Sequence, residues 1–173
     1  MVKYKMSIKP NKKNNKIIKP WKIINKIPVR DTNACIKLLK KNKRFISPWI
    51  INIFKKKNYS YNKFKKPIIL FRVKLSDFGF KTPTTLNKFY KKIDNKYSLV
   101  HPAIALYVRD IYDEQKTGEW LRFATPMKSM IDTDGVPHLP KLGKALKSHF
   151  IETYWSYPKA IFHPHNEFIV QKK

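Results

Sequence analysis

The uneven distribution of charge along this chain is the feature that most constrains its fold. Residues 1–66 hold 21 Lys and Arg side chains and a single acid, Asp31, whereas residues 67–173 hold 17 basic and ten acidic side chains. A segment with so large an excess of one sign repels itself when it becomes compact. We therefore predict two parts, a partly helical basic extension of residues 1–66 and a domain of residues 67–173.

The total charge points to a polyanionic partner. The 173 residues carry a formal net charge of +27. Counterion release would make the binding of such a chain to RNA strong and steeply dependent on salt. An anionic membrane surface is the competing partner. RNA packed inside an assembly fits this charge best, so we regard a membrane as the weaker alternative. As a separate observation, no stretch of the sequence approaches the ~18 apolar residues of a membrane span.

The start of the chain and its composition bear on the compartment. The first six residues lack the apolar core of a secretory signal and the Arg- and Ser-rich character of a transit peptide. If the protein works in an organelle, synthesis inside that organelle is one interpretation of this start. Lys, Asn and Ile dominate residues 1–66, which is typical of A/T-rich genomes. An organellar gene and a nuclear gene of an A/T-rich organism both fit this composition.

The extension is expected to contain an extended arm, two short helices and a linker. Pro10, Pro20 and Pro28 prevent a long helix near the start. Helices are predicted over residues 31–44, capped by Asp31 or Thr32, and from Ser47-Pro48 onward. The apolar residues of the second helix, Trp49 to Phe54, suit core packing or a membrane surface. The aromatic rings of the linker, residues 58–66, suit stacking on RNA bases or packing on the domain.

The domain is predicted to alternate strands and helices. Strict alternation of apolar and basic residues predicts a strand that ends at Leu75. Apolar residues at helical spacing predict helices over residues 82–93 and 139–150. Further strands are expected at residues 103–108, 120–123, 160–162 and 168–170, with a possible continuation at 127–131. This order, β-α-β-β-α-β, predicts an α+β class and a ferredoxin-like sandwich.

Part of the domain resembles the small-subunit ribosomal protein ten family. Residues 71–78 (Phe-Arg-Val-Lys-Leu-Ser-Asp-Phe) are similar to the first strand and turn of that family. Residues 107–109 and 113–120 stand where the family has a strand ending in Leu-Arg and a charged loop. Residues 125–132 stand where it has a Thr, a basic residue and Leu-Ile-Asp. The family's Gly-Pro-Ile-Pro-Leu-Pro loop is missing, and Asp110-Ile111-Tyr112 replaces its Ser-Pro-His.

The resemblance implies a structural protein of a mitochondrial small ribosomal subunit, located in the matrix. Its partners would be rRNA and neighbouring small-subunit ribosomal proteins, reached in part through a long hairpin. The residues implied as contacts of the domain are Arg109, Lys116, Arg122 and Lys128. The basic clusters of the extension would add phosphate contacts that carry no base specificity. These residues are Lys12, Lys13, Lys16, Lys40, Lys41, Lys43, Arg44, Lys55, Lys56, Lys57, Lys65 and Lys66.

No pattern in the sequence supports catalysis, a cofactor, a metal site or a small-molecule substrate. The four Gly residues form no phosphate-binding loop. His163 and His165 lack a third Cys or His nearby. Cys35 is the only cysteine, and it has no partner His. The acids Asp110, Asp113 and Glu114 are better explained as a hairpin tip beside many cations, so we expect a protein that is not an enzyme.

Two other hypotheses compete with the ribosomal one. The first is an accessory subunit of a mitochondrial respiratory or ATP synthase complex, with residues 49–54 lying on the membrane. The second is a single-chain RNA-binding or processing factor. We disfavour that factor because residues 1–66 offer no obvious way to form a self-contained core.

Overall fold

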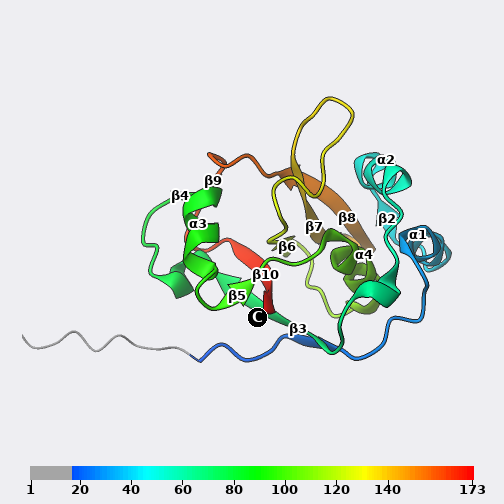
Figure 1. The fold of residues 1–173 in the computed structure, drawn as a ribbon, viewed down its shortest axis with the longest axis horizontal. Helices are drawn as coiled ribbons and strands as arrows, with labels where there is room; N and C mark the ends of the chain where they lie inside the picture. Colours follow the sequence, from blue (N-terminus) through cyan, green and yellow to red (C-terminus); the bar gives the residue numbers. More distant parts are fainter. Residues whose placement is uncertain (1–16) are drawn as a thin grey trace, which may run out of the picture.

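The computed structural model describes residues 17–173, which form a mixed α/β fold with four α helices and a mixed sheet (Figure 1). The strands follow the order β1-β3-β10-β6-β7-β8-β2, and β5 pairs with β10. All pairs are antiparallel except β10 with β6 and β2 with β8. The predicted α+β class is compatible with this architecture.

The elements have the following bounds. The sheet contains β1 (Lys22–Ile24), β2 (Phe45–Ile46), β3 (Ile68–Lys74), β5 (Tyr97–Ser98), β6 (Trp120–Phe123), β7 (His138–Ala145), β8 (Ser148–Trp155) and β10 (Glu167–Lys172). A separate two-stranded ladder contains β4 (Thr84–Thr85) and β9 (Ile161–Phe162). The helices are α1 (Thr32–Lys41), α2 (Pro48–Lys56), α3 (Leu86–Ile93) and α4 (Pro102–Ile111), with short 3-10 turns η1 (Tyr61–Lys63) and η2 (Leu75–Phe78).

Two hydrophobic clusters lie on opposite faces of the sheet. In β10, Ile169 joins the cluster formed with α1, α2 and α4, whereas Phe168 and Val170 join the cluster formed with α3. This division follows from the two-residue period of a strand, which sends successive side chains to opposite faces. The strand β3 shows the same division, since Leu70 belongs to the first cluster and Val73 to the second.

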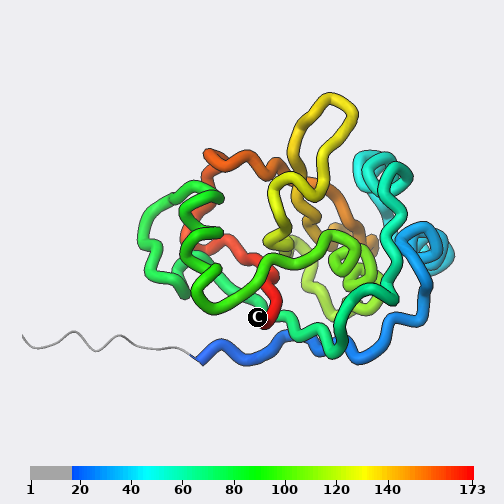
Figure 2. The backbone as a smooth tube through the Cα atoms, viewed as in Figure 1, coloured from blue at the N-terminus to red at the C-terminus, as the bar shows by residue number. Residues whose placement is uncertain are grey.

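The described part of the basic extension is built into this sheet. Residues 22–24 and 45–46 supply the strands at the two ends of the strand order, β1 and β2. Figure 2 shows the blue N-terminal stretch running beside β3 before it turns into α1. Ile24, Leu39 and Phe54 are buried in the same cluster as residues of α4 and the sheet. Residues 17–66 therefore share a core with residues 67–173, because their apolar side chains bury against the sheet while most of their lysines are exposed.

Several predicted elements are confirmed. The helix predicted from residue 31 is α1, capped by Asp31, whose side chain accepts the Ala34 N–H at 2.8 Å. The helix predicted at Ser47-Pro48 is α2, with Pro48 as its first residue. The strands predicted over 68–75 and 120–123 are β3 and β6. The helix predicted over 82–93 is α3, which begins only at Leu86, with Thr85 as its cap.

The strand predicted over residues 103–108 is wrong, because this segment lies inside α4. His101 caps this helix by accepting the Ala103 N–H at Nδ1, 3.2 Å away, and Pro102 occupies the first turn. Every residue from Pro102 to Arg109 is buried. A helix that is apolar on all sides lacks the periodic polar face by which sequence patterns identify helices.

The helix predicted over residues 139–150 is also wrong, because this segment forms the β7–β8 hairpin. Leu146 lies at the turn with a φ of 51° and is exposed, whereas a helical stripe would have buried it. Residues 127–131 do not continue β6 as a strand, although Ile131 makes an isolated bridge to Pro137. The ferredoxin-like order of elements is consequently not confirmed.

Candidate nucleic-acid interface

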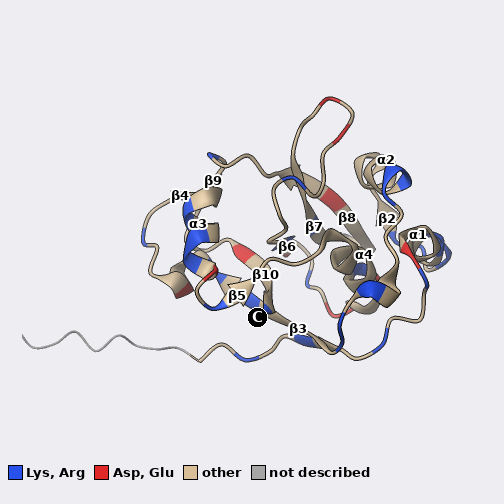
Figure 3. Cartoon of the chain, in the orientation of Figure 1, with Lys and Arg blue, Asp and Glu red and all other residues tan. Residues whose placement is uncertain are grey.

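A groove of about 350 Å³ between α1 and α2 brings basic side chains together. We call it the basic groove; it is lined by Arg30, Asp31, Asn33, Ile36, Lys37, Lys40, Ile51, Lys55 and Asn58. Four of these nine residues are cations and one is an acid. Figure 3 shows Lys and Arg on both helices that form it.

The fold positions these cations from three segments. Lys37 and Lys40 lie three residues apart in α1, so they share one face of the helix. Lys55 comes from the last turn of α2, and Arg30 precedes the cap of α1. Ile36 is buried and also lines the groove, so apolar packing of the two helices holds the ammonium groups along one groove.

The single acid of the basic groove is already engaged within the protein. The Asp31 carboxylate accepts the Ala34 N–H and pairs with the Arg30 guanidinium, whose Nε lies 3.0 Å away. The hydrogen bond from Ala34 lowers the pKa of Asp31, and the arginine charge acts in the same direction. Lys37, Lys40 and Lys55 are exposed. Their charges give the groove a positive electrostatic potential, which attracts an anion such as a phosphate.

Asn58 also lines the basic groove and links the two helices that form it. Its Oδ1 accepts hydrogen bonds from the Thr32 hydroxyl and the Asn33 N–H, each at 3.1 Å. These bonds join the chain after α2 to the first turn of α1, so the relative position of the two helices is fixed by polar as well as apolar contacts.

The basic residues predicted to contact RNA are distributed unevenly around this groove. Lys40 and Lys55 line it, and Lys41, Lys43, Lys56 and Lys57 are exposed at or just beyond the ends of the same two helices. Lys65 and Lys66 lie before β3, and Lys116 and Lys128 are exposed on loops elsewhere in the chain. Lys12, Lys13 and Lys16 lie outside the described residues.

Two predicted contacts, Arg109 and Arg44, are used inside the protein. Arg109 is fully buried, and its guanidinium donates to the Gln115 side chain and to the carbonyl groups of Tyr112 and Gly143. Burial lowers its pKa to about 10, so it stays charged near neutral pH. The expected contact between Arg109 and RNA is therefore wrong. Arg44 pairs with Asp113, and its side chain is only 16% exposed.

Arg122 also has limited access to solvent. It lies on the α3 face of the sheet, with its guanidinium carbon 5.2 Å from the Tyr154 ring centre and 5.7 Å from that of Phe162. Burial lowers its pKa. Cation–π contact with two rings gives Arg122 a packing role within the sheet.

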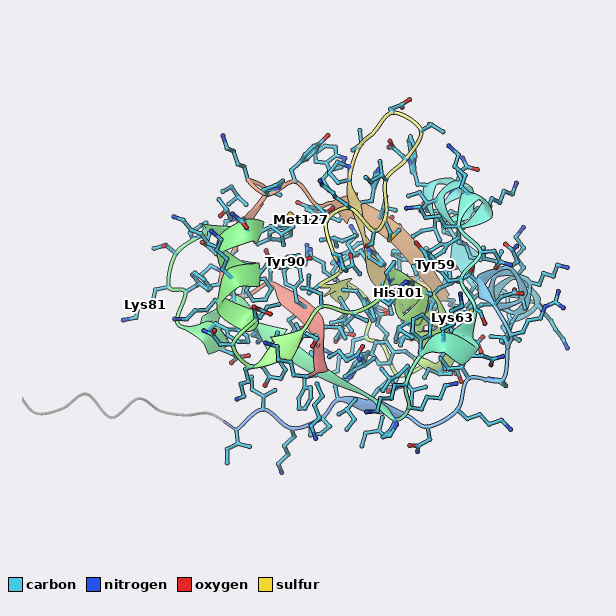
Figure 4. The ribbon with its side chains drawn as sticks, in the orientation of Figure 1. Tyr59, Lys63, Lys81, Tyr90, His101 and Met127 are labelled. Carbon is cyan, nitrogen blue, oxygen red and sulfur yellow. The ribbon has the colours of Figure 1, made fainter. Side chains whose placement is uncertain are left out.

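The aromatic linker, residues 58–66, packs on the protein. Tyr61 is fully buried, and its hydroxyl donates to the Ala103 carbonyl at 2.8 Å. The rings of Tyr59 and Phe64 lie 4.4 and 4.8 Å from the His101 ring, and Figure 4 labels Tyr59 beside His101. Of the two interpretations of this linker, packing on the domain is the one that the structure supports.

Sequence reasoning missed two cations of the basic groove, Arg30 and Lys37. The three-residue spacing of Lys37 and Lys40 is a signal that the two share a helical face. The participation of Arg30 depends on how the chain enters α1, which the sequence pattern does not reveal.

The apolar face of α2 is occupied by the core, with Ile50, Ile53 and Phe54 buried. Within residues 17–173, no helix has both the length and the apolar character needed to traverse a bilayer. The same residues contain no group of three or more His, Cys, Asp or Glu side chains arranged to hold a metal.

No protein-family model, curated protein or solved structure matches this chain.

Proposed function

We propose that this protein is a non-catalytic RNA-binding component of a ribonucleoprotein assembly. The observation that carries the proposal is the basic groove, where Arg30, Lys37, Lys40 and Lys55 converge around one engaged acid. Four cations along one groove suit the repeated charges of a sugar-phosphate backbone better than a single small anion. Such contacts position RNA without reading its sequence.

The rest of the chain supports a permanent polyanionic partner. Six of its 38 basic residues lie in residues 1–16, ahead of the described part. Further exposed lysines of α3 and the loops surround the folded body (Figure 3). A free protein with a net charge of +27 would repel itself, and RNA packed around it would relieve that repulsion.

The more specific proposal is a structural place in the small subunit of a mitochondrial ribosome, beside rRNA and neighbouring proteins. It rests on the family resemblance of residues 71–78, 107–109, 113–120 and 125–132. The ferredoxin-like core that the family implies differs from the elements at residues 102–111 and 138–155. The general proposal of RNA binding does not depend on that resemblance.

The competing placement on a respiratory or ATP synthase complex relied on residues 49–54 as a membrane-surface helix. Three apolar residues of that segment are buried in the core, which removes most of the apolar surface available to a membrane. The cationic surface alone would then have to hold the protein on lipid.

Fractionation of a native extract on a density gradient tests the proposal. We expect the protein to sediment with small ribosomal subunits in non-ionic detergent, and to be released by ribonuclease or by high salt. Sedimentation with a membrane complex that detergent disperses would contradict it. Recovery as a free monomer whose sedimentation is unchanged by ribonuclease would also contradict it, and would favour a processing factor or another role.

A further inference from the structure

At one edge of the sheet, β8 extends beyond its neighbour β2. The short strand β2 pairs only with Phe150 and Ile151 of β8. The chain then leaves the sheet, after the Ser47 N–H has donated to the Ile151 carbonyl at 3.0 Å. No strand within residues 17–173 pairs with residues 152–155 of β8 on this side.

The free backbone groups of this edge belong to Thr153 and Trp155. The Ser156 N–H donates to the Pro137 carbonyl on the β7 side, so the even-numbered residues of β8 bond to β7. The Ile151 carbonyl bonds to Ser47 on the β2 side, so the odd-numbered residues face the open edge. Thr153 lies opposite Pro140, which has no N–H to offer, in agreement with this alternation.

A groove of about 460 Å³ runs along this edge, and we call it the edge groove. Trp49 and Trp155 are 47% and 63% exposed. Trp155 pairs in register with His138, whose ring stacks on Trp49 of α2, so both tryptophans lie on the side of the sheet that faces α2. Phe45, 57% exposed, pairs in register with Phe150 and lies on the opposite side. The complete lining is Phe45, Ser47, Pro48, Trp49, Glu152, Thr153, Tyr154 and Trp155.

Ser47 adds an unpartnered polar group to the edge groove. It is 7% exposed, and its Oγ finds no hydrogen-bond partner within residues 17–173. It precedes the first turn of α2 without capping it by a side-chain hydrogen bond. A buried hydroxyl and free N–H groups of a helix terminus together favour an incoming carbonyl oxygen.

We propose that the edge groove binds an extended segment of a partner protein, which adds to the sheet as a strand next to β8. The backbone of such a segment would bond to Thr153 and Trp155, and its alternate side chains would meet the two aromatic walls. The lining contains no Lys or Arg and one acid, Glu152, in a chain of net charge +27. Glu152 is itself paired with Lys141, whose Nζ lies 2.7 Å from its Oε1. The lining therefore offers no cation to a phosphate, which disfavours RNA, and repulsion between two such chains disfavours a second copy.

Selection from a phage-displayed library of random decapeptides on the immobilised full-length protein tests this proposal. We expect enriched peptides to be uncharged with alternating apolar residues, and to slow hydrogen exchange at the Thr153 and Trp155 amides. The variant Thr153→Pro removes one edge donor without removing a bond to β7, since it lies opposite Pro140. It should weaken peptide binding at least about tenfold, the loss of ~1.4 kcal/mol.

Trp155→Ala is the second variant, and it decides the test should Thr153→Pro fail to fold. Its matched control is Trp120→Ala, because Trp120 is also partly exposed on the sheet, 39%, but lies outside the edge groove. Binding should be lost in Trp155→Ala and kept in Trp120→Ala. The proposal is overturned if no peptide is enriched, or if the enriched peptides bind all variants equally. Protection of these two amides by oligouridylate or by self-association, and not by peptides, also overturns it.

Discussion

Replacing the four cations of the basic groove with glutamine tests how RNA is bound. In a variant with Arg30, Lys37, Lys40 and Lys55 changed to Gln, the groove keeps its shape but loses its positive charges, because these side chains lie at the surface of α1, α2 and the preceding loop. If each cation neutralises one phosphate of a single strand, the slope of log Kobs against log salt falls by about 0.7 per residue, or about 2.8 in all.

That slope converts into a directly measurable difference. When salt rises from 50 to 200 mM, the RNA affinity of the native protein should fall about 50-fold more than that of the variant. This factor follows from a difference of ~2.8 between the two slopes of log Kobs over a fourfold change in salt concentration. Fluorescence anisotropy with a labelled oligouridylate, repeated at several salt concentrations, gives both slopes. The affinity at the lowest salt should also fall in the variant.

A matched control separates the groove from general charge. Lys88, Lys91, Lys92 and Lys96 are exposed on and just after α3, and changing all four to Gln removes the same formal charge. We expect this control to change the salt slope much less than the groove variant. If the two variants have equal slopes and affinities, binding is diffuse and our assignment of the basic groove is wrong.

Three further predictions concern buried groups. Arg109→Met should lower the free energy of unfolding by about 3 kcal/mol or more in urea titrations, because buried acceptors lose their donor; an unchanged midpoint would contradict this, and the salt slope of RNA binding should stay native. Burial raises the pKa of the Cys35 thiol to about 12, so a thiol reagent should modify it only after unfolding, and rapid reaction of the native protein would show that Cys35 is accessible. Burial lowers the pKa of His101, so the unfolded state binds a proton first as the pH falls below about 6.5. Its contribution to stability is present above that pH and declines below it. Melting temperatures from pH 7.5 to 5.5 should fall less in His101→Asn, which keeps a capping side chain, and an equal fall would exclude this role.

The sequence was informative where local chemistry dominates. Asp31 is a good helix cap, Pro48 suits a first turn, and the alternation ending at Leu75 is a strand signal. These features correspond to α1, α2 and β3. In each case the pattern needs no information about distant parts of the chain.

The errors arose where tertiary packing overrides local pattern. Residues 102–109 are buried on all sides, so α4 shows no polar face. In residues 138–150 the side chains of Leu139 and Leu142 lie on opposite faces of one strand. Their three-residue spacing also fits a helix. A three-residue separation is compatible with either structure, and pairing with β6 and β8 decides between them.

For the candidate sites too, tertiary packing limits what the sequence alone can predict. Lysine clusters identified α1 and α2 as basic, and Lys40 and Lys55 do line the basic groove. Arg109 stands out in the sequence as a charged contact, yet burial in α4 commits it to Gln115 and Tyr112. Whether a charged residue faces solvent or is buried depends on the fold, and counting charges in the sequence does not distinguish an exposed residue from a buried one.

Ultraviolet crosslinking of the protein to RNA in its native particle, followed by mass spectrometry of the crosslinked peptides, tests the central claim most directly. Our account predicts nucleotide adducts in peptides that contain residues 30–40 and 51–58, which line the basic groove. It also predicts none at residues 152–155 of the edge groove. The absence of RNA adducts throughout the chain, or adducts confined to the edge groove, would contradict the proposal that the charge of this protein serves to bind RNA between α1 and α2.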